Sequence, residues 1–291
     1  MICIVIGYFI CSKETIVMFA GKTIIITGGS SGLGEALAHR LAARGANLAL
    51  VARSHDKLNT VLKKIQSSGY HAQKVEAFSS DVREIESIEQ TVKKIAAVVG
   101  EPDILINSAG ILRENYFEAL PVQTFQEIMD INFFGTLCWI KAVLPFFKKK
   151  GEGRIVNICS MGGLIGTFGY SAYCSSKHAI TGLTSSLRVE LKPQNIKCHL
   201  VCPSEFESPM VDDLNTYRTV ENRKMVLTIP VMGIQRVAGD IIRGIEKDKY
   251  LIVPGAVTRF FERLNRYFPS LTRWTSDRII QRCYRGPSMS D

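Results

Sequence analysis

Short runs of apolar and β-branched residues alternate along the chain with longer stretches in which apolar residues recur every three or four positions. The runs at 23–27 and 47–51 are typical of buried strands, and the stretches at 33–44 and 55–67 are typical of amphipathic helices. Further strands are predicted at residues 75–79, 104–107, 154–158, 197–202 and 250–253. Nearly continuous apolar strands separated by helices indicate a parallel sheet covered on both faces. We therefore predict a Rossmann-type, doubly wound α/β fold with its ligand site at the carboxyl ends of the strands.

The pattern divides the chain into an apolar segment at 1–17, the α/β domain at 18–255 and a helical extension at 256–291. The apolar run lacks the basic residues that open a signal peptide, and Lys13 and Glu14 end it short of a membrane-spanning length. Three interpretations remain open: a membrane-dipping segment, packed structure, or translated sequence upstream of the true start. We favour a start at Met18, because this residue leads directly into the first predicted strand.

The extension combines arginines with aromatic residues. The chain has a formal net charge of +9, and between Arg259 and Arg285 seven arginines stand against two acids. They interleave with Phe260, Phe261, Leu264, Tyr267, Phe268, Leu271 and Trp274. This pattern suits peripheral contact with the cytoplasmic face of an anionic membrane, and it equally suits closure over a substrate cleft or an interface in a homo-oligomer. No nucleic-acid-binding motif accompanies the charge, so DNA or RNA is not an expected partner.

The eight cysteines include no CxxC pair, and no histidines accompany them at metal-ligand spacing. Cytoplasmic proteins keep such thiols reduced. We therefore expect free buried thiols, a cytoplasmic protein and no metal site.

A glycine-rich loop, Thr-Gly-Gly-Ser-Ser-Gly-Leu-Gly, follows the first predicted strand and opens the first predicted helix. Gly28 allows a tight turn, Gly32 lets the backbone approach a pyrophosphate, and Gly34 lets the helix pack closely on the strand. The start of the helix, with Leu33 inside it, would then face the phosphates. In a strand–loop–helix context this pattern predicts a dinucleotide site.

The residue after the second strand indicates which dinucleotide is bound. Enzymes that use NAD usually place an acid there to hold the ribose 2′-hydroxyl, whereas this chain has Arg53. A guanidinium can donate two parallel hydrogen bonds to a 2′-phosphate, whereas a carboxylate would repel it. Ser30 and Ser31 can add hydroxyl donors to the same phosphate. We therefore predict NADP(H); the alternative is that Arg53 is a solvated residue at the start of a helix.

A serine, a tyrosine and a lysine have the spacing of a proton-transfer site. Ser160 follows the strand at 154–158, and Tyr173 and Lys177, four residues apart, lie on one face of a helix. Protonating a ketone near pH 7 calls for a tyrosine pKa about 3 below its usual ~10, which corresponds to ~4 kcal/mol. A lysine charge 4–6 Å away contributes about 3–4 kcal/mol. We therefore expect Lys177 to lower the pKa of Tyr173, Ser160 to orient the carbonyl, and Asn132 to hold a water that links Lys177 to solvent.

In this order and spacing the motifs resemble the short-chain dehydrogenase/reductase family from about Lys22 to Val253. The resemblance implies that Asp81 and Val82 hold the adenine. It also implies that the rest of the nucleotide site is formed by Asn107, Ala109, Gly110, Tyr173, Lys177, Pro203, Phe206 and Ser208. Two residues depart from the family pattern: Ser108 replaces the second asparagine of Asn-Asn-Ala-Gly, and Ser204 replaces the glycine after Pro203.

Within this family the chain most resembles the 3-ketodihydrosphingosine reductases, on the segments 166–173, 189–193 and 203–209. That resemblance implies NADPH-dependent reduction of a long-chain 2-amino-3-ketone in sphingolipid synthesis. Glu205 and Glu207 are then candidates to bind the substrate ammonium, together with Ser160 and Tyr173 at the ketone.

Two alternative functions remain open. The chain could be a general reductase of 3-oxoacyl, steroid or aldehyde substrates, or a cofactor-binding scaffold without catalysis. Scaffolds of this family typically lose the tyrosine or the lysine, and this chain keeps both Tyr173 and Lys177.

Overall fold

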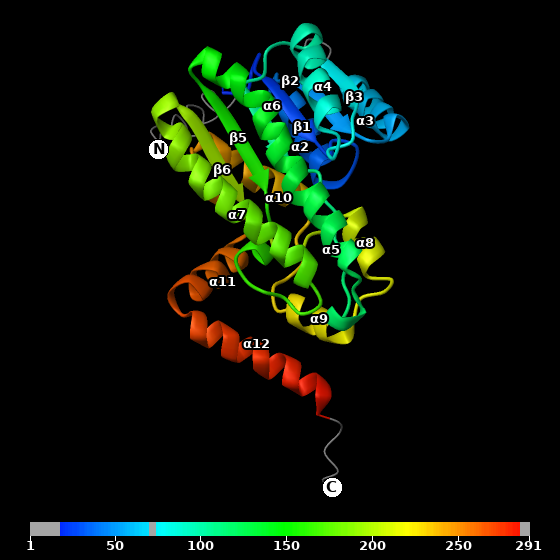
Figure 1. The fold of residues 1–291 in the computed structure, drawn as a ribbon, viewed down its shortest axis with the longest axis vertical. Coiled ribbons are helices and arrows are strands. Elements are labelled where there is room, and N and C mark those ends of the chain that lie inside the picture. The colour runs from blue at the N-terminus through cyan, green and yellow to red at the C-terminus, as the bar shows by residue number, and fades with distance from the viewer. Residues whose placement is uncertain (1–17, 70–73, 286–291) are drawn as a thin grey trace, which may run out of the picture.

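A computed structural model describes residues 18–69 and 74–285, so the apolar segment at 1–17 lies outside the described residues. Its centre is a seven-stranded parallel sheet with the order β3-β2-β1-β4-β5-β6-β7 (Figure 1). The strands are β1 (Thr23–Thr27), β2 (Asn47–Ala52), β3 (Val75–Ser79), β4 (Ile104–Asn107), β5 (Gly153–Ile158), β6 (Ile196–Val201) and β7 (Leu251–Ile252). This architecture confirms the predicted fold class.

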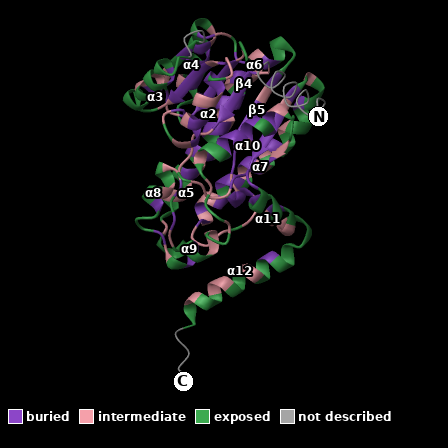
Figure 2. Ribbon diagram, turned by 180° about the vertical axis from the view of Figure 1, so that it is seen from behind, coloured by how far each residue is buried: buried purple, intermediate pink, exposed green. Residues whose placement is uncertain are grey.

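Helices cover both faces of the sheet because side chains alternate along each strand. Ile24 and Ile26 of β1 pack into the core beneath α2 (Gly32–Ala42), α3 (His55–Ser67) and α10 (Ile234–Glu246). Ile25 points to the opposite core, which includes residues of α4 (Ile85–Val98), α6 (Gly135–Lys150) and α7 (Ser171–Leu191). Figure 2 shows that the buried residues concentrate in these layers. Both faces of the sheet are therefore buried, and a ligand site is expected at the carboxyl ends of the strands.

A long helical run crosses one face of the sheet. It joins α5 (Val122–Met129) to α6 through a π-helical segment, Asp130–Phe134, which carries Asn132. Single π-turns inside helices often mark functional sites. By length and hydropathy the run Val122–Lys150 could span a membrane, but Trp139 and Phe147 are fully buried in the protein core. It is therefore a core helix of the domain.

Shorter helices surround the carboxyl ends of the strands. They are η1 (Phe117–Ala119), η3 (Met161–Gly163), α8 (Pro209–Leu214), α9 (Val220–Val226), α11 (Ala256–Tyr267) and α12 (Pro269–Tyr284), whereas η4 (Lys192–Gln194) precedes β6 at the opposite end of the sheet. The pair α11–α12 projects beyond the sheet, and α12 contacts α9 (Figure 1). Most residues of α12 are exposed or half-buried (Figure 2). The predicted extension thus consists of two helices that lie beside the carboxyl ends of the strands.

Candidate active site

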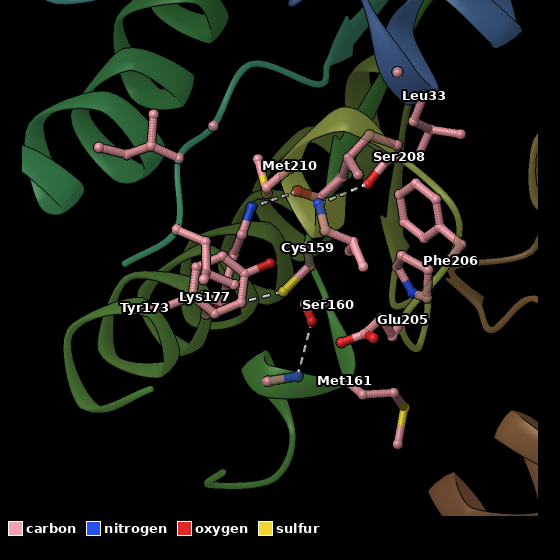
Figure 3. A pocket seen from close by; sticks show the side chains of 18 of the residues that line it. Leu33, Cys159, Ser160, Met161, Tyr173, Lys177, Glu205, Phe206, Ser208 and Met210 are labelled. Carbon is pink, nitrogen blue, oxygen red and sulfur yellow. Dashed lines mark hydrogen bonds between the residues drawn. The ribbon is translucent and has the colours of Figure 1, made fainter. Parts of the chain in front are cut away.

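A cavity of about 680 Å³ opens at the carboxyl ends of the strands. Its wall begins at the glycine-rich loop, passes Ser160, Tyr173 and Lys177, which Figure 3 shows, and ends against α9, α11 and α12. The cavity is continuous, so a nucleotide at one end and an apolar molecule at the other would meet at the tyrosine.

The glycine-rich loop forms a cradle that suits a pyrophosphate. Gly28 has a φ of 69°, which favours glycine, and a Cβ on it would lie 2.8 Å from the Ala109 nitrogen. A Cβ on Gly34 would overlap the Gly28 carbonyl, so only glycine lets α2 start this close to the strand. Ser31 precedes α2 without capping it through its side chain. The first N–H groups of α2 are therefore available to an anion in the cavity.

Two cations lie at the end of the cavity beyond β2. Arg53 and Lys57 both line it, and both side chains are exposed. Sequence reasoning missed Lys57, although a basic residue four positions after Arg53, in the first turn of the predicted helix, was a usable signal. These residues together can hold a phosphate on a ribose.

Asp81 and Val82 line the cavity next to this basic end. Asp81 forms an ion pair with Arg83 at 2.6 Å, and the hydrogen bonds from Arg83 lower the pKa of the Asp81 carboxyl despite its partial burial. The carboxylate is therefore held ionised mainly by Arg83, with a smaller contribution from Arg53.

Asn107 departs from the expectation that it contacts the nucleotide. It is buried on β4 and lies outside the cavity wall, and its amide donates to Asn157 Oδ1 at 2.9 Å. The next residues do reach the cavity, because Thr27 Oγ1 accepts from the backbone N–H groups of Ser108 and Ala109 at 3.1 and 3.2 Å. Asn107 thus joins two strands in the core rather than binding a ligand through its side chain.

The structure brings Ser160, Tyr173 and Lys177 together at the middle of the cavity (Figure 3). Ser160 follows β5, and its hydroxyl accepts from the Gly162 N–H at 3.0 Å and lies in the same part of the cavity as Tyr173. Lys177, one turn along α7, donates to the Ile158 carbonyl at 3.0 Å and sits 5.5 Å from the centre of the Tyr173 ring. A carbonyl oxygen placed here would meet two hydroxyl groups.

The pKa of Tyr173 differs from the expectation. Burial raises it above the ordinary value, and the nearby Ser160 hydroxyl offsets this only in part. Burial also lowers the pKa of Lys177. Desolvation of the two enclosed groups outweighs the attraction on which the sequence argument relied. The protein's own residues therefore keep Tyr173 protonated, which is the form that donates a proton to a carbonyl.

Asn132 lies behind the cavity wall and is fully buried. Its Oδ1 accepts from the Ile111 N–H at 2.8 Å, and its Nδ2 donates to the Ile111 carbonyl and to Ser176 Oγ, each at 3.0 Å. Asn132 thus fixes the loop after β4 against α7, next to Lys177. Its assignment as the holder of a water stays a prediction.

The far end of the cavity is mainly apolar, with hydroxyl groups of Thr272, Thr275 and Ser276 among the apolar side chains. Side chains from the loop after β5, from α8 and α9, and from α11 and α12 form it: Met161, Ile165, Leu214, Met225, Val226, Ile229, Phe261, Leu264 and Ile279. The C-terminal extension therefore contributes directly to the wall of the cavity. A flexible alkyl chain matches such a lining.

The two glutamates proposed for the substrate are separated. Glu205 lines the cavity, but both of its carboxylate oxygens accept from Arg218, at 3.0 Å for one and in a shorter contact for the other. Glu207 is exposed and outside the wall. This corrects the expectation of a free carboxylate at the substrate, because the buried charge of Glu205 is already compensated.

Arg218 also connects this ion pair to the catalytic helix. It donates to the Tyr170 hydroxyl at 3.3 Å, and the Tyr170 ring packs edge-on against Tyr173 at 5.6 Å between ring centres. Sequence reasoning missed Arg218 and Tyr170, because nothing in the local pattern pairs residues so distant along the chain.

Comparisons with known proteins agree with this geometry. The family model for short chain dehydrogenase matches residues 22–219. A 3-ketodihydrosphingosine reductase of Bos taurus is 35% identical over 225 residues, covering 77% of this chain and 68% of that protein. One of Dictyostelium discoideum is 31% identical over 283 residues, covering 92% of this chain and 84% of that protein.

Solved structures give the same picture of the fold. Levodione reductase aligns with a TM-score of 0.74 and 27% identity, covering 81% of this chain and 96% of that one. A short chain dehydrogenase/reductase from Burkholderia phymatum, solved in complex with NAD, aligns with a TM-score of 0.77 at 21% identity, covering 87% of this chain and 96% of that one.

Proposed function

The chain belongs to the short-chain dehydrogenase/reductase family of oxidoreductases, and we propose that it uses NADPH to reduce a long-chain 2-amino-3-ketone of the 3-ketodihydrosphingosine type. One observation carries the proposal: a single cavity joins a phosphate cradle, the Ser160–Tyr173–Lys177 group and an apolar chamber. The product would be the corresponding secondary alcohol, dihydrosphingosine, an intermediate of sphingolipid synthesis.

In the proposed reaction each residue of the site has a separate role. A nicotinamide nucleotide bound along the glycine-rich loop supplies the hydride. Ser160 donates a hydrogen bond to the ketone oxygen and orients it, and Tyr173 gives its proton to that oxygen as negative charge develops. Lys177 donates to the Ile158 carbonyl, and its protonated form places a positive charge beside the tyrosine. Burial of the group excludes water and strengthens each of these interactions.

The preference for NADPH rests on the charge at the ribose end. Arg53 and Lys57 line the cavity there, and the nearby acid, Asp81, is held by Arg83. A 2′-phosphate would add negative charge between two exposed cations, whereas a 2′-hydroxyl would leave them without a ligand. The arrangement therefore favours the phosphorylated nucleotide.

The choice of a lipid ketone rests on the apolar chamber and on the named activity of the relatives. Since Glu205 is already paired with Arg218, the alkyl chain rather than the ammonium is expected to supply most of the binding energy. Each buried methylene contributes ~0.8 kcal/mol, or about fourfold in kcat/KM, until the chamber is full.

We therefore expect kcat/KM for NADPH oxidation to rise with chain length in a series of 2-amino-3-ketones. The measurement compares this series with a des-amino long-chain ketone, a steroid ketone and a 3-oxoacyl thioester. A flat response to chain length, or a higher kcat/KM for the steroid or the thioester, would instead support a general reductase.

We also propose that the outer side of the extension contacts an anionic membrane on its cytoplasmic face, so that a lipid ketone can enter from the bilayer. Phe260 and Phe268 are each 61% exposed and Trp274 is 54% exposed, and the exposed Arg263 and Arg273 lie among them. Apolar and basic groups in one helical pair match the interface between acyl chains and anionic headgroups.

The double variant Arg263→Gln, Arg273→Gln is expected to weaken binding to phosphatidylserine vesicles about 30-fold, since each basic residue near such a surface contributes ~1 kcal/mol. Vesicle co-sedimentation measures it. A matched control is Lys93→Gln, Lys94→Gln, which removes two exposed charges from α4. Equal effects in both variants, or no binding by the wild type, would rule out this surface.

A further inference from the structure

Two cysteines lie next to each other at the floor of the cavity. The parallel register of β5 and β6 pairs Ile158 with Val201, so the next residues, Cys159 and Cys202, are direct neighbours. Backbone pairing continues on both sides of them: the Cys159 N–H donates to the Val201 carbonyl at 2.8 Å, and Met161 donates to Pro203 at 2.9 Å. Paired strands lie about 4.8 Å apart, within the range of Cα separations that a disulfide spans.

The surroundings give the two thiols different roles. Cys159 is 3% exposed and lines the cavity, whereas Cys202 is fully buried behind it. As a thiol, Cys159 donates to the Lys177 carbonyl at 3.2 Å and lies 3.5 Å from Thr181 Oγ1 (Figure 3). A small oxidant in the cavity therefore meets Cys159 first.

Charge and hydrogen bonding make Cys159 the nucleophile of the pair. Burial by itself raises its pKa, but the neighbouring Cys202 thiol and the charge of Lys177 outweigh burial and lower this pKa below its ordinary value. The neighbouring Cys159 and burial raise the pKa of Cys202. Cys159 is therefore the thiol of the pair that ionises more readily, and it reacts first, in its thiolate form.

We propose that Cys159 and Cys202 are a peroxide-sensitive thiol pair whose oxidation to a disulfide switches off the active site. The Cys159 thiolate attacks one oxygen of hydrogen peroxide, the O–O bond breaks, and hydroxide leaves, which gives a sulfenic acid. Cys202 sulfur then attacks Cys159 sulfur, the S–O bond breaks, and water leaves with the Cys202 proton. In total two thiols are oxidised, one peroxide is reduced to two waters, and an external dithiol reverses the change.

The packing around Cys159 favours the disulfide over further oxidation. A Cβ on Gly163 would overlap the Cys159 sulfur, so there is little room for additional oxygen atoms on that side. A resolving thiol is already in place across the strands. Bond formation would pull the Cys159 sulfur from the Lys177 carbonyl and shift Ser160 and Pro203, the residues that follow the two cysteines. A displacement of ~1 Å among reacting groups can cost about 10²-fold in rate.

The test treats the reduced full-length protein with hydrogen peroxide and follows intact mass, disulfide-mapped peptides and NADPH-dependent ketone reduction. We expect a mass loss of two hydrogens, a Cys159–Cys202 cross-linked peptide, and a fall in activity of about tenfold or more that dithiothreitol restores. The mass and peptide readouts need no substrate, so they decide this proposal independently of the proposed reaction.

Four variants complete the design. Cys202→Ser should trap the sulfenic acid on Cys159, which dimedone labels, and Cys159→Ser should show neither label nor cross-link. The matched control is Cys198→Ser, a buried cysteine on the same strand whose register partner is Ile155 rather than a thiol, and it should still form the disulfide. A wild type that keeps its mass under peroxide, or a loss of two hydrogens and of activity that persists in both Cys202→Ser and Cys202→Ala, would overturn the proposal.

Discussion

Replacing Tyr173 with phenylalanine is expected to lower kcat for ketone reduction by about 10²–10⁴-fold, the usual loss when a general acid is removed. Phenylalanine keeps the ring that packs against Tyr170, so the cavity should retain its shape. It removes only the hydroxyl that lies within reach of Ser160. Steady-state NADPH oxidation measures kcat, and a fluorescence titration should show that NADPH still binds.

Tyr170→Phe is the matched control for this experiment. Tyr170 lines the same cavity and lies three residues away, but its hydroxyl accepts a hydrogen bond from Arg218. Its removal should therefore affect KM more than kcat and remain far below the loss at Tyr173. If Tyr173→Phe keeps more than half of the wild-type kcat, Tyr173 is not the proton donor.

Arg53→Asp is expected to reverse the cofactor preference. The change removes a charge-assisted contact to the 2′-phosphate and puts a carboxylate in its place, so the ratio of kcat/KM for NADPH to that for NADH should fall about 10²-fold or more. Lys57→Gln should shift the ratio in the same direction by less, because one cation remains at the ribose end.

Lys63→Asp makes an equal change of charge on α3 at an exposed position outside the cavity wall. It should leave the NADPH to NADH ratio near that of the wild type. A ratio that Arg53→Asp does not move, or that Lys63→Asp moves equally, would show that Arg53 is a solvated residue and would remove the main support for NADPH.

Most of the sheet was predictable because parallel strands are buried on both faces and appear as continuous apolar runs. The predicted bounds of β1, β3 and β4 are those of the structure. The weaker predictions are in the C-terminal strands: β6 starts at Ile196 rather than 197, and β7 has two residues where four were expected, because only Leu251 and Ile252 pair with β6.

The parts of the site that are local in sequence could also be predicted, and the parts that depend on distant contacts could not. The glycine-rich loop and the Tyr173–Lys177 spacing are fixed by one turn and one helix. The pairing of Glu205 with Arg218 depends instead on how the turn between α8 and α9 folds back on the loop after β6. The pKa of Tyr173 is likewise set by burial, which the spacing of two residues does not reveal.

The central claim is that this cavity transfers hydride to a ketone with a proton from Tyr173. The most direct test incubates the protein with NADPH that carries deuterium at the transferred position of the nicotinamide, together with a long-chain 2-amino-3-ketone. Mass spectrometry and NMR of the product should show one deuterium on the new carbinol carbon, and Tyr173→Phe should form this product far more slowly. A ketone recovered unchanged, or an alcohol without deuterium, would contradict the claim.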